Sequence, residues 1–199
     1  MPTRLPQDAE LDALTEACNI GMAHAATALS QLMGKGVAIQ APRLQFLDGA
    51  GLSELLDDEP VRALHLQILG NVRGSILILL REANARRILE LLLGQGQGSQ
   101  PLAEMEASTL MEVGNILASA CLNALGLMLK MTLLPSVPAL ISGSASEVLD
   151  RVMDRSSGGD SVLMVDTVFS ICEAFCSGSL FLMPAPESIP AMMSALQGK

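Results

Sequence analysis

Apolar residues recur along the chain at two spacings, one typical of helices and one typical of strands. In residues 8–33 they fall at steps of three and four, which predicts an amphipathic helix capped by Asp8 and ended by the glycines that follow it. Residues 63–69 and 74–80 are strand-like runs, and the short glycine-containing turn between them predicts a hairpin. The other elements predicted here are an extended segment broken at Pro42, a short helical patch at 53–56 and a helix at 83–93.

The same order of elements occurs again after a linker rich in glycine and glutamine at 94–101. Gly74 in the first predicted hairpin corresponds to Gly178 in the second, since each is followed by serine. The second set of elements is a long helix at 102–130, an extended segment through Pro135 and Pro138, a short helix at 147–153, a hairpin of 161–171 with 175–183, and a last helix at 188–196.

This repetition predicts a single domain over residues 1–199, built from the half-repeats 1–93 and 102–199. Each half contributes helices and strands, so the predicted fold class is α+β with pseudo-twofold symmetry. In this fold the halves share one antiparallel sheet, and the two long helices pack together. The order of the strands does not follow from the sequence.

A shift of 96 residues aligns the two long helices and superimposes Glu16 on Glu112 and Asn19 on Asn115. At about 100° per residue, the polar positions of each helix fall within roughly 60° of one another and nearly opposite to the apolar stripe. We therefore expect each helix to present its polar positions to solvent. The two trios are Asp12, Glu16 and Asn19, and Ser108, Glu112 and Asn115.

Asparagine is a poor residue for the middle of a helix, because its amide competes with the backbone for hydrogen bonds. Both helices nevertheless have one. Small neighbours could leave the carboxylate and amide above a low surface that a partner approaches, or they could let the long helices pack together, which we favour for Gly114 and Ala25. These small neighbours are Gly21 and Ala23 in the first helix and Gly114, Ala118 and Ser119 in the second.

The segments DALTEACN at 12–19 and STLMEVGN at 108–115 share Asp or Ser, then Glu, then Asn at fixed spacing. In each repeat 22 residues separate the Asn from a proline, which is Pro42 or Pro138. This doubled motif resembles the CheC/CheX/FliY family of chemotaxis phosphatases, which dephosphorylate the response regulator CheY. Two intact motifs are typical of the CheC type. The second copy is closer to the family pattern, since it has Gly114 where the first has Cys18.

The resemblance implies a protein aspartyl-phosphate phosphatase, a hydrolase, whose catalytic residues are Glu16, Asn19, Glu112 and Asn115. In this family the Asn orients the attacking water and the Glu pairs with a lysine of the response regulator. The supporting motif positions are Asp12, Pro42, Ser108 and Pro138. The response regulator supplies Mg²⁺, so no cofactor or metal of the chain's own is expected.

Composition narrows the function classes further. Half of the residues are hydrophobic, yet the most apolar stretch, 116–134, contains Asn123 and Lys130 and is predicted as a buried helix rather than a membrane span. The formal net charge of −9 and the 2% aromatic content argue against a nucleic-acid partner. No secretory signal precedes residue 12, and we expect a cytoplasmic protein.

The cysteines and histidines do not predict a metal site. Neither His24 nor His65 has a second ligand at zinc-type spacing, and a reducing compartment favours buried free thiols. The four cysteines are Cys18, Cys121, Cys172 and Cys176.

Two other functions fit parts of the pattern. One is a non-enzymatic binding module similar to the middle domain of the motor switch protein FliM, which would not need both Glu and Asn. The other is an adaptor that holds a CheD-like deamidase, and the sequence does not weigh this role against catalysis. A metal hydrolase ranks last. Since the pseudo-twofold is contained in one chain, we expect a monomer.

Overall fold

A computed structural model of the chain describes residues 8–40, 43–47, 59–93, 104–152, 162–171 and 174–197. The helices are α1 (Asp8–Met33), α3 (Glu82–Leu93), α4 (Glu104–Leu129), α5 (Ala145–Val152) and α6 (Ile189–Gln197). The strands are β1 (Val37–Ile39), β2 (Arg43–Leu47), β3 (Pro60–Gly70), β4 (Gly74–Arg81), β5 (Leu133–Pro135), β6 (Ala139–Ser144), β7 (Val162–Ile171) and β8 (Ala174–Pro184). Both predicted long helices and both predicted hairpins are confirmed.

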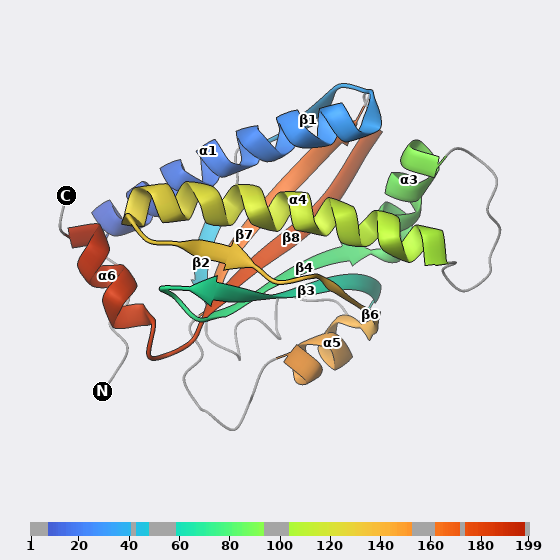
Figure 1. Cartoon of the computed structure of the whole chain (residues 1–199). Coiled ribbons are helices and arrows are strands. Elements are labelled where there is room, and N and C mark those ends of the chain that lie inside the picture. The colour runs from blue at the N-terminus through green and yellow to red at the C-terminus, as the bar shows by residue number, and fades with distance from the viewer. Residues whose placement is uncertain are drawn as a thin grey trace.

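The strands form one sheet in the order β1-β7-β8-β4-β3-β5, with β2 also paired to β7 and β6 also paired to β3. Every strand pairing among the described residues is antiparallel. The two hairpins therefore meet at the centre, where β4 pairs with β8, and each half places its short strands on the outer edge of the other half's hairpin (Figure 1). This exchange of edge strands ties the halves into one sheet.

The registers confirm the internal duplication. Arg43 of β2 pairs with Asp166 of β7, and Ala139 of β6, which lies 96 residues after Arg43, pairs with His65 of β3. The same shift that aligns the long helices thus relates the two sheet edges. The predicted α+β class with pseudo-twofold symmetry and a shared antiparallel sheet is confirmed.

The predicted match of Gly74 with Gly178 is wrong by two residues. Ile68 pairs with Gly74, whereas its counterpart Phe169 pairs with Cys176. Gly74 is a glycine for a local reason, since its φ is 148° and an added Cβ would lie 2.3 Å from the carbonyl oxygen of Met183. Because that requirement belongs to the first hairpin alone, matching glycines gave the wrong alignment.

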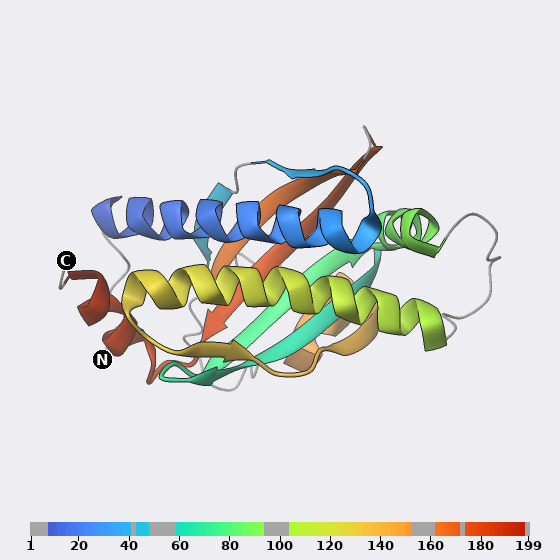
Figure 2. The same cartoon turned by 45° about the horizontal axis from the view of Figure 1, so that its top comes forward.

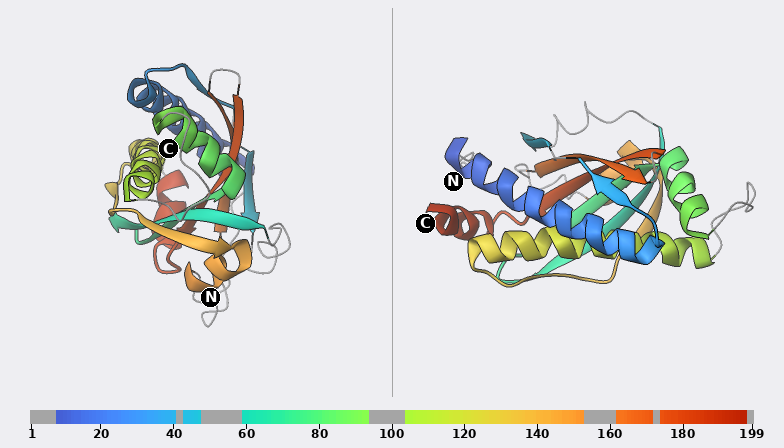
Figure 3. Two further views of the ribbon diagram at one scale, coloured as in Figure 1. Left: turned by 90° about the vertical axis from the view of Figure 1, so that its right-hand side faces the viewer. Right: turned by 90° about the horizontal axis from the view of Figure 1, so that it is seen from above.

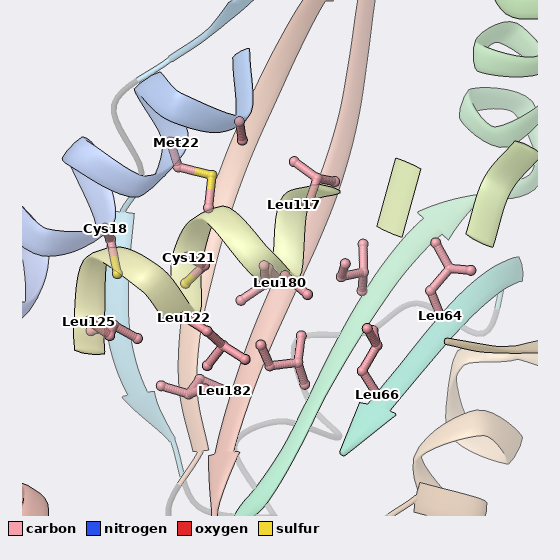
Figure 4. Packing of buried hydrophobic residues seen from close by; sticks show 14 of the residues in the cluster. Cys18, Met22, Leu64, Leu66, Leu117, Cys121, Leu122, Leu125, Leu180 and Leu182 are labelled. Atoms are coloured by element: carbon pink, nitrogen blue, oxygen red, sulfur yellow. The ribbon is translucent and has the colours of Figure 1, made fainter. Parts of the chain in front are cut away.

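Helices α1 and α4 run antiparallel, side by side, over one face of the sheet, and α5 lies on the other face (Figures 1–3). Most of the core lies between the long helices and the sheet. Figure 4 shows part of this layer, with Cys18 and Cys121 on the helices and Leu180 and Leu182 on β8. The strand residues of this layer include Leu64, Leu66, Ile76, Ile78, Leu180 and Leu182. A second cluster under α5 contains Val61, Ala63, Leu77, Leu79, Phe181 and Met183.

Helix α4 is the one helix in the described ranges that is long and apolar enough to cross a membrane, and 61% of its most apolar window is buried inside the fold. Its apolar surface faces the sheet and α1, as predicted for a core helix. Cys18 and Cys121 are buried free thiols, also as predicted. Some predictions fall outside the described residues: the patch at 53–56, the linker at 94–101, Pro42 and Cys172.

Candidate functional site

In α1 the predicted trio lies on the side of the helix away from the sheet. Asp12 and Glu16 are exposed, and Asn19 is half-buried. The opposite side of the helix is buried, including Leu14 and Ala25. Asp12 and Glu16 therefore lie in solvent, as the spacing predicts, whereas Asn19 is only partly exposed to solvent.

Helix α4 repeats this arrangement. Ser108 and Glu112 are exposed, and Asn115 is half-buried. Leu110 and Leu117 of the same helix are buried in the core. The same exposure at all three positions in both helices means that the duplication extends from the sequence to the surface.

The contact between the long helices fixes the direction in which each trio faces. A Cβ added to Gly21 would lie 3.0 to 3.2 Å from atoms of Ala120, Cys121 and Ala124, so this side of α1 faces α4. Asn19 is about 160° around α1 from Gly21, and Asn115 is about 180° around α4 from Ala124. Each trio thus lies on the outer flank of its own helix, and the two sites open to opposite sides of the helix pair. Figure 2 shows the two helices side by side.

The predicted catalytic side chains form no side-chain hydrogen bond or ion pair that would explain their presence. Within the described part of the chain, Glu16, Asn19, Glu112 and Asn115 have no hydrogen bond or ion pair. A mid-helix Asn costs helix propensity, and here it gains no internal partner in return. These groups are available to a ligand.

The electrostatic character of the helix layer is one-sided. The sequence of α1 contains four acidic residues and that of α4 contains three, while neither contains Lys or Arg. The field around both sites is therefore negative, which favours a partner with basic groups at the point of contact.

The small neighbours of the motif divide between two roles. Gly21 packs against α4, and Gly114 packs against the sheet, where an added Cβ would lie 2.7 Å from Cδ1 of Leu64. The prediction that these glycines form a low surface is wrong, and so is the prediction that Gly114 lets the two long helices pack together, since it contacts β3 instead. Ala118 is buried as well. Ala23 and Ser119, each four residues after the Asn, do remain at the surface and leave room beside it.

One feature of the site was missed by sequence reasoning. Ile20 follows Asn19 directly and is 44% exposed, and Ile116 follows Asn115 and is half-buried. The signal was available, because the shift of 96 residues also superimposes these two residues. An apolar side chain thus accompanies each polar pair.

Among the residues that the structure describes, no group of three or more His, Cys, Asp or Glu side chains gathers as a metal site would. His24 lies exposed on α1, while His65 lies half-buried in β3, where burial lowers the pKa of its imidazole. Pro138 lies between β5 and β6, in a segment that Ser136 ties to Gln67 of β3 by two hydrogen bonds of 2.9 Å. The origin of any Mg²⁺ stays a prediction.

Comparison with known proteins supports this description. Residues 10–45 and 105–142 match the model of the CheC-like family. The CheY-P phosphatase CheC of Bacillus subtilis (strain 168) is 29% identical over 201 residues, which cover 96% of this chain and 95% of that protein. Each of the two matched segments contains one of the Glu and Asn pairs.

Two solved structures share the fold. The crystal structure of Thermotoga maritima FliY has a TM-score of 0.80 at 18% identity and covers 98% of this chain and 100% of that one. The FliM middle domain from H. pylori has a TM-score of 0.68 at 15% identity and covers 96% of this chain and 99% of that one. The chain has the pseudo-symmetric α+β fold of FliY and of the FliM middle domain, with a duplicated Glu and Asn motif. The CheC-like family model matches both segments that contain the motif, so the resemblance found in the sequence is confirmed.

Proposed function

We propose that this protein is a chemotaxis phosphatase that hydrolyses the aspartyl phosphate of a CheY-type response regulator. The observation that carries the proposal is the pair of outward-facing Glu and Asn side chains, present twice and without partners among the described residues. The name of the B. subtilis relative, a CheY-P phosphatase, supports the same activity.

In this mechanism, Asn19 or Asn115 enters the regulator's phosphorylated site and holds a water molecule in line with the phosphorus. A neutral amide suits this task, since one end accepts a hydrogen bond from the water and the other donates one. The Mg²⁺ ion of the regulator neutralises charge on the phosphoryl group. Each Asn is expected to contribute about 2–4 kcal/mol of transition-state stabilisation, a hundred- to thousandfold in rate.

Glu16 and Glu112 hold the complex in register by pairing with a regulator lysine. Both carboxylates lie one helical turn before their Asn, and both are exposed. Because α1 and α4 contain no Lys or Arg, each Glu is free of a competing cation on its own helix. Asp12 and Ser108 stand one further turn back and extend the same surface.

The test is phosphate release from receiver domains labelled with acetyl phosphate, with and without the protein. The wild-type chain should accelerate release, and the variant Asn19→Ala/Asn115→Ala should return the rate to the regulator's own. The variant should keep its fold, because exchanging a surface mid-helix Asn for Ala favours the helix by a few tenths of a kcal/mol. Circular dichroism checks this.

Full acceleration by a folded double variant would contradict the assignment of the Asn residues. No acceleration by the wild-type chain on any receiver would favour a second candidate, a binding module without catalysis. The fold shared with the FliM middle domain favours that candidate. An adaptor role towards a CheD-like deamidase is compatible with either outcome.

A further inference from the structure

The duplicated surface contains an apolar pair as well as the polar ones. Ile20 lies four residues after Glu16 and is 44% exposed, and Ile116 holds the same place after Glu112. On a helix, residues four apart are neighbours, so each Ile stands next to its Glu and extends the site by one turn. Ile116 also packs partly against the main core cluster, whereas Ile20 is not among the residues in that contact.

Neither helix stability nor the core explains Ile20. A β-branched residue is less favourable in a helix than Leu or Ala, and the core beneath α1 is filled from the opposite side. Like Asn19, which has no side-chain partner among the described residues, Ile20 is therefore a residue that neither helix stability nor core packing requires.

Other large apolar side chains of the long helices are exposed without this pattern. Leu127 is 77% exposed, and the residue at its place in α1 is Gln31. Met105 is 69% exposed, and its counterpart in α1 is an alanine. Such scattered exposure is ordinary for a protein surface. Ile20 and Ile116 differ because both copies keep the side chain beside the motif.

We propose that Ile20 and Ile116 are the apolar anchors on which each site seats its receiver domain, and that they determine affinity rather than the chemical step. The inference rests on the proposed function. The occupant has to offer an apolar contact and a basic group side by side, since the Ile stands next to a Glu on a helix with no Lys or Arg. A phosphorylated receiver with a lysine beside its aspartate and an apolar neighbour meets this requirement.

The experiment isolates one site at a time. The Asn115→Ala background leaves the α1 site to work alone, and Ile20→Gln is added to it. We expect KM for the phosphorylated receiver to rise about five- to tenfold, with kcat within about twofold, because only the exposed 44% of the Ile20 side chain can become buried on binding. Ile20→Val should keep most of the affinity. In the reciprocal Asn19→Ala background, Ile116→Gln should raise KM and Ile20→Gln should not.

Leu127→Gln is the matched control. It removes a more exposed apolar side chain from α4 and installs the residue that α1 already has at this place. Leu127 lies 11 residues beyond Ile116, about 16 Å along the helix axis. This variant should leave KM unchanged in the Asn19→Ala background, where only the α4 site works, and thermal unfolding should show that all variants are folded.

Calorimetric binding of receivers activated with beryllofluoride separates this inference from the proposed function. Weaker binding of Ile20→Gln to such a receiver supports the anchor even if no receiver is hydrolysed, in which case only the phosphatase proposal fails. Unchanged binding and unchanged KM overturn the anchor. A fall in kcat at constant KM also overturns it, because the side chain would then act on the chemical step.

Discussion

Helices α1 and α4 present the same surface above different interiors. Both have 26 residues, and their Glu, Asn and Ile positions coincide after the 96-residue shift. Beneath the motif, α1 has Cys18 where α4 has Gly114, and α4 has Cys121 where α1 has Ala25. The Glu, Asn and Ile of the motif are the same in both helices while these two inward positions differ, which is expected if a partner constrains the motif and only volume constrains the core beneath it.

The diverged positions still fit together. Figure 4 shows Cys18 and Cys121 side by side at the crossing of the helices, and the hydrogen bond between the two thiols, together with burial, raises the pKa of the Cys121 thiol well above its ordinary value. The Cys121 thiol is therefore protonated at neutral pH, and both buried cysteines serve as packing groups. Gly114 leaves a gap that Leu64 of β3 fills, and the counterpart of Leu64 by register is the smaller Val165.

The largest effect is expected from filling that gap. Gly114→Ala would place a methyl group 2.7 Å from Cδ1 and 3.2 Å from Cβ of Leu64, so α4 or β3 has to move. We expect a loss of about 2 kcal/mol in the free energy of unfolding, measured by urea denaturation. Adding Leu64→Val, which imitates the pairing in the other half, should recover part of the loss.

Gly36→Ala is the control for the loss of a glycine, because an added Cβ there meets nothing within 4 Å. It should change stability by less than about 0.5 kcal/mol. If Gly114→Ala proved as stable as the wild type, the close packing of α4 on Leu64 would be wrong.

The next effect concerns an ion cluster in one half only. Glu82, at the start of α3, lies 2.6 Å from Nε of Arg62 and 3.1 Å from Nε of Arg86. Burial alone would raise the pKa of the Glu82 carboxyl, but the hydrogen bonds and charges of the two arginines outweigh it and hold this pKa below its ordinary value. The register counterpart of Arg62 is Leu163, which has no charge to offer.

Because the folded pKa of Glu82 is lowered, its contribution is complete above the unfolded pKa of about 4.3 and disappears as the pH falls through the folded value. Glu82→Gln should therefore cost about 1 kcal/mol at pH 7 and progressively less below pH 4. Urea denaturation at several pH values measures this. Glu90→Gln, which breaks an exposed pair with Arg87, should change little at any pH. A constant difference at all pH values would contradict the role of Glu82.

The sequence predicts the elements that depend on local periodicity and turn residues. The long helix predicted from Asp8 to about Met33 is confirmed as α1, because its apolar spacing and the glycine after it are local signals. The strand order was not predictable, since the exchange of edge strands between the halves is a long-range pairing with no local signal. The half-buried state of Asn19 and the contact of Gly114 with Leu64 are likewise set by tertiary packing.

The two sites can be compared directly by single substitutions. Each site has its own Glu and Asn, so Asn19→Ala and Asn115→Ala should each leave part of the phosphatase activity. We expect the loss to be larger for Asn115→Ala, because its helix is closer to the family pattern. This variant should lose about half to two-thirds of the rate, which corresponds to less than about 1 kcal/mol in the apparent activation free energy. Steady-state phosphate release measures it. Complete loss in either single variant would mean that the two copies do not work independently.

The last comparison concerns the ends of the two long helices. The residue after α1 is Gly34 with φ of 60°, and the equivalent residue after α4 is Lys130 with φ of 54°. The turn after α4 is closed by the Met131 N–H, which donates to the carbonyl of Gly126 at 2.9 Å, as in a Schellman cap. A left-handed conformation is unfavourable for a residue with a Cβ and free of strain for glycine.

Lys130→Gly should therefore raise the free energy of unfolding by about 0.5–1 kcal/mol. Gly34→Ala should lower it by a similar amount, and only through the backbone, because an added Cβ at Gly34 has no atom within 4 Å. Urea denaturation of the two variants at pH 7 makes the comparison. The two variants should change the free energy of unfolding in opposite directions. A change in the same direction would mean that the two helix ends are not equivalent caps. Phosphatase activity should be the same in both variants, because neither residue lies near a Glu and Asn pair.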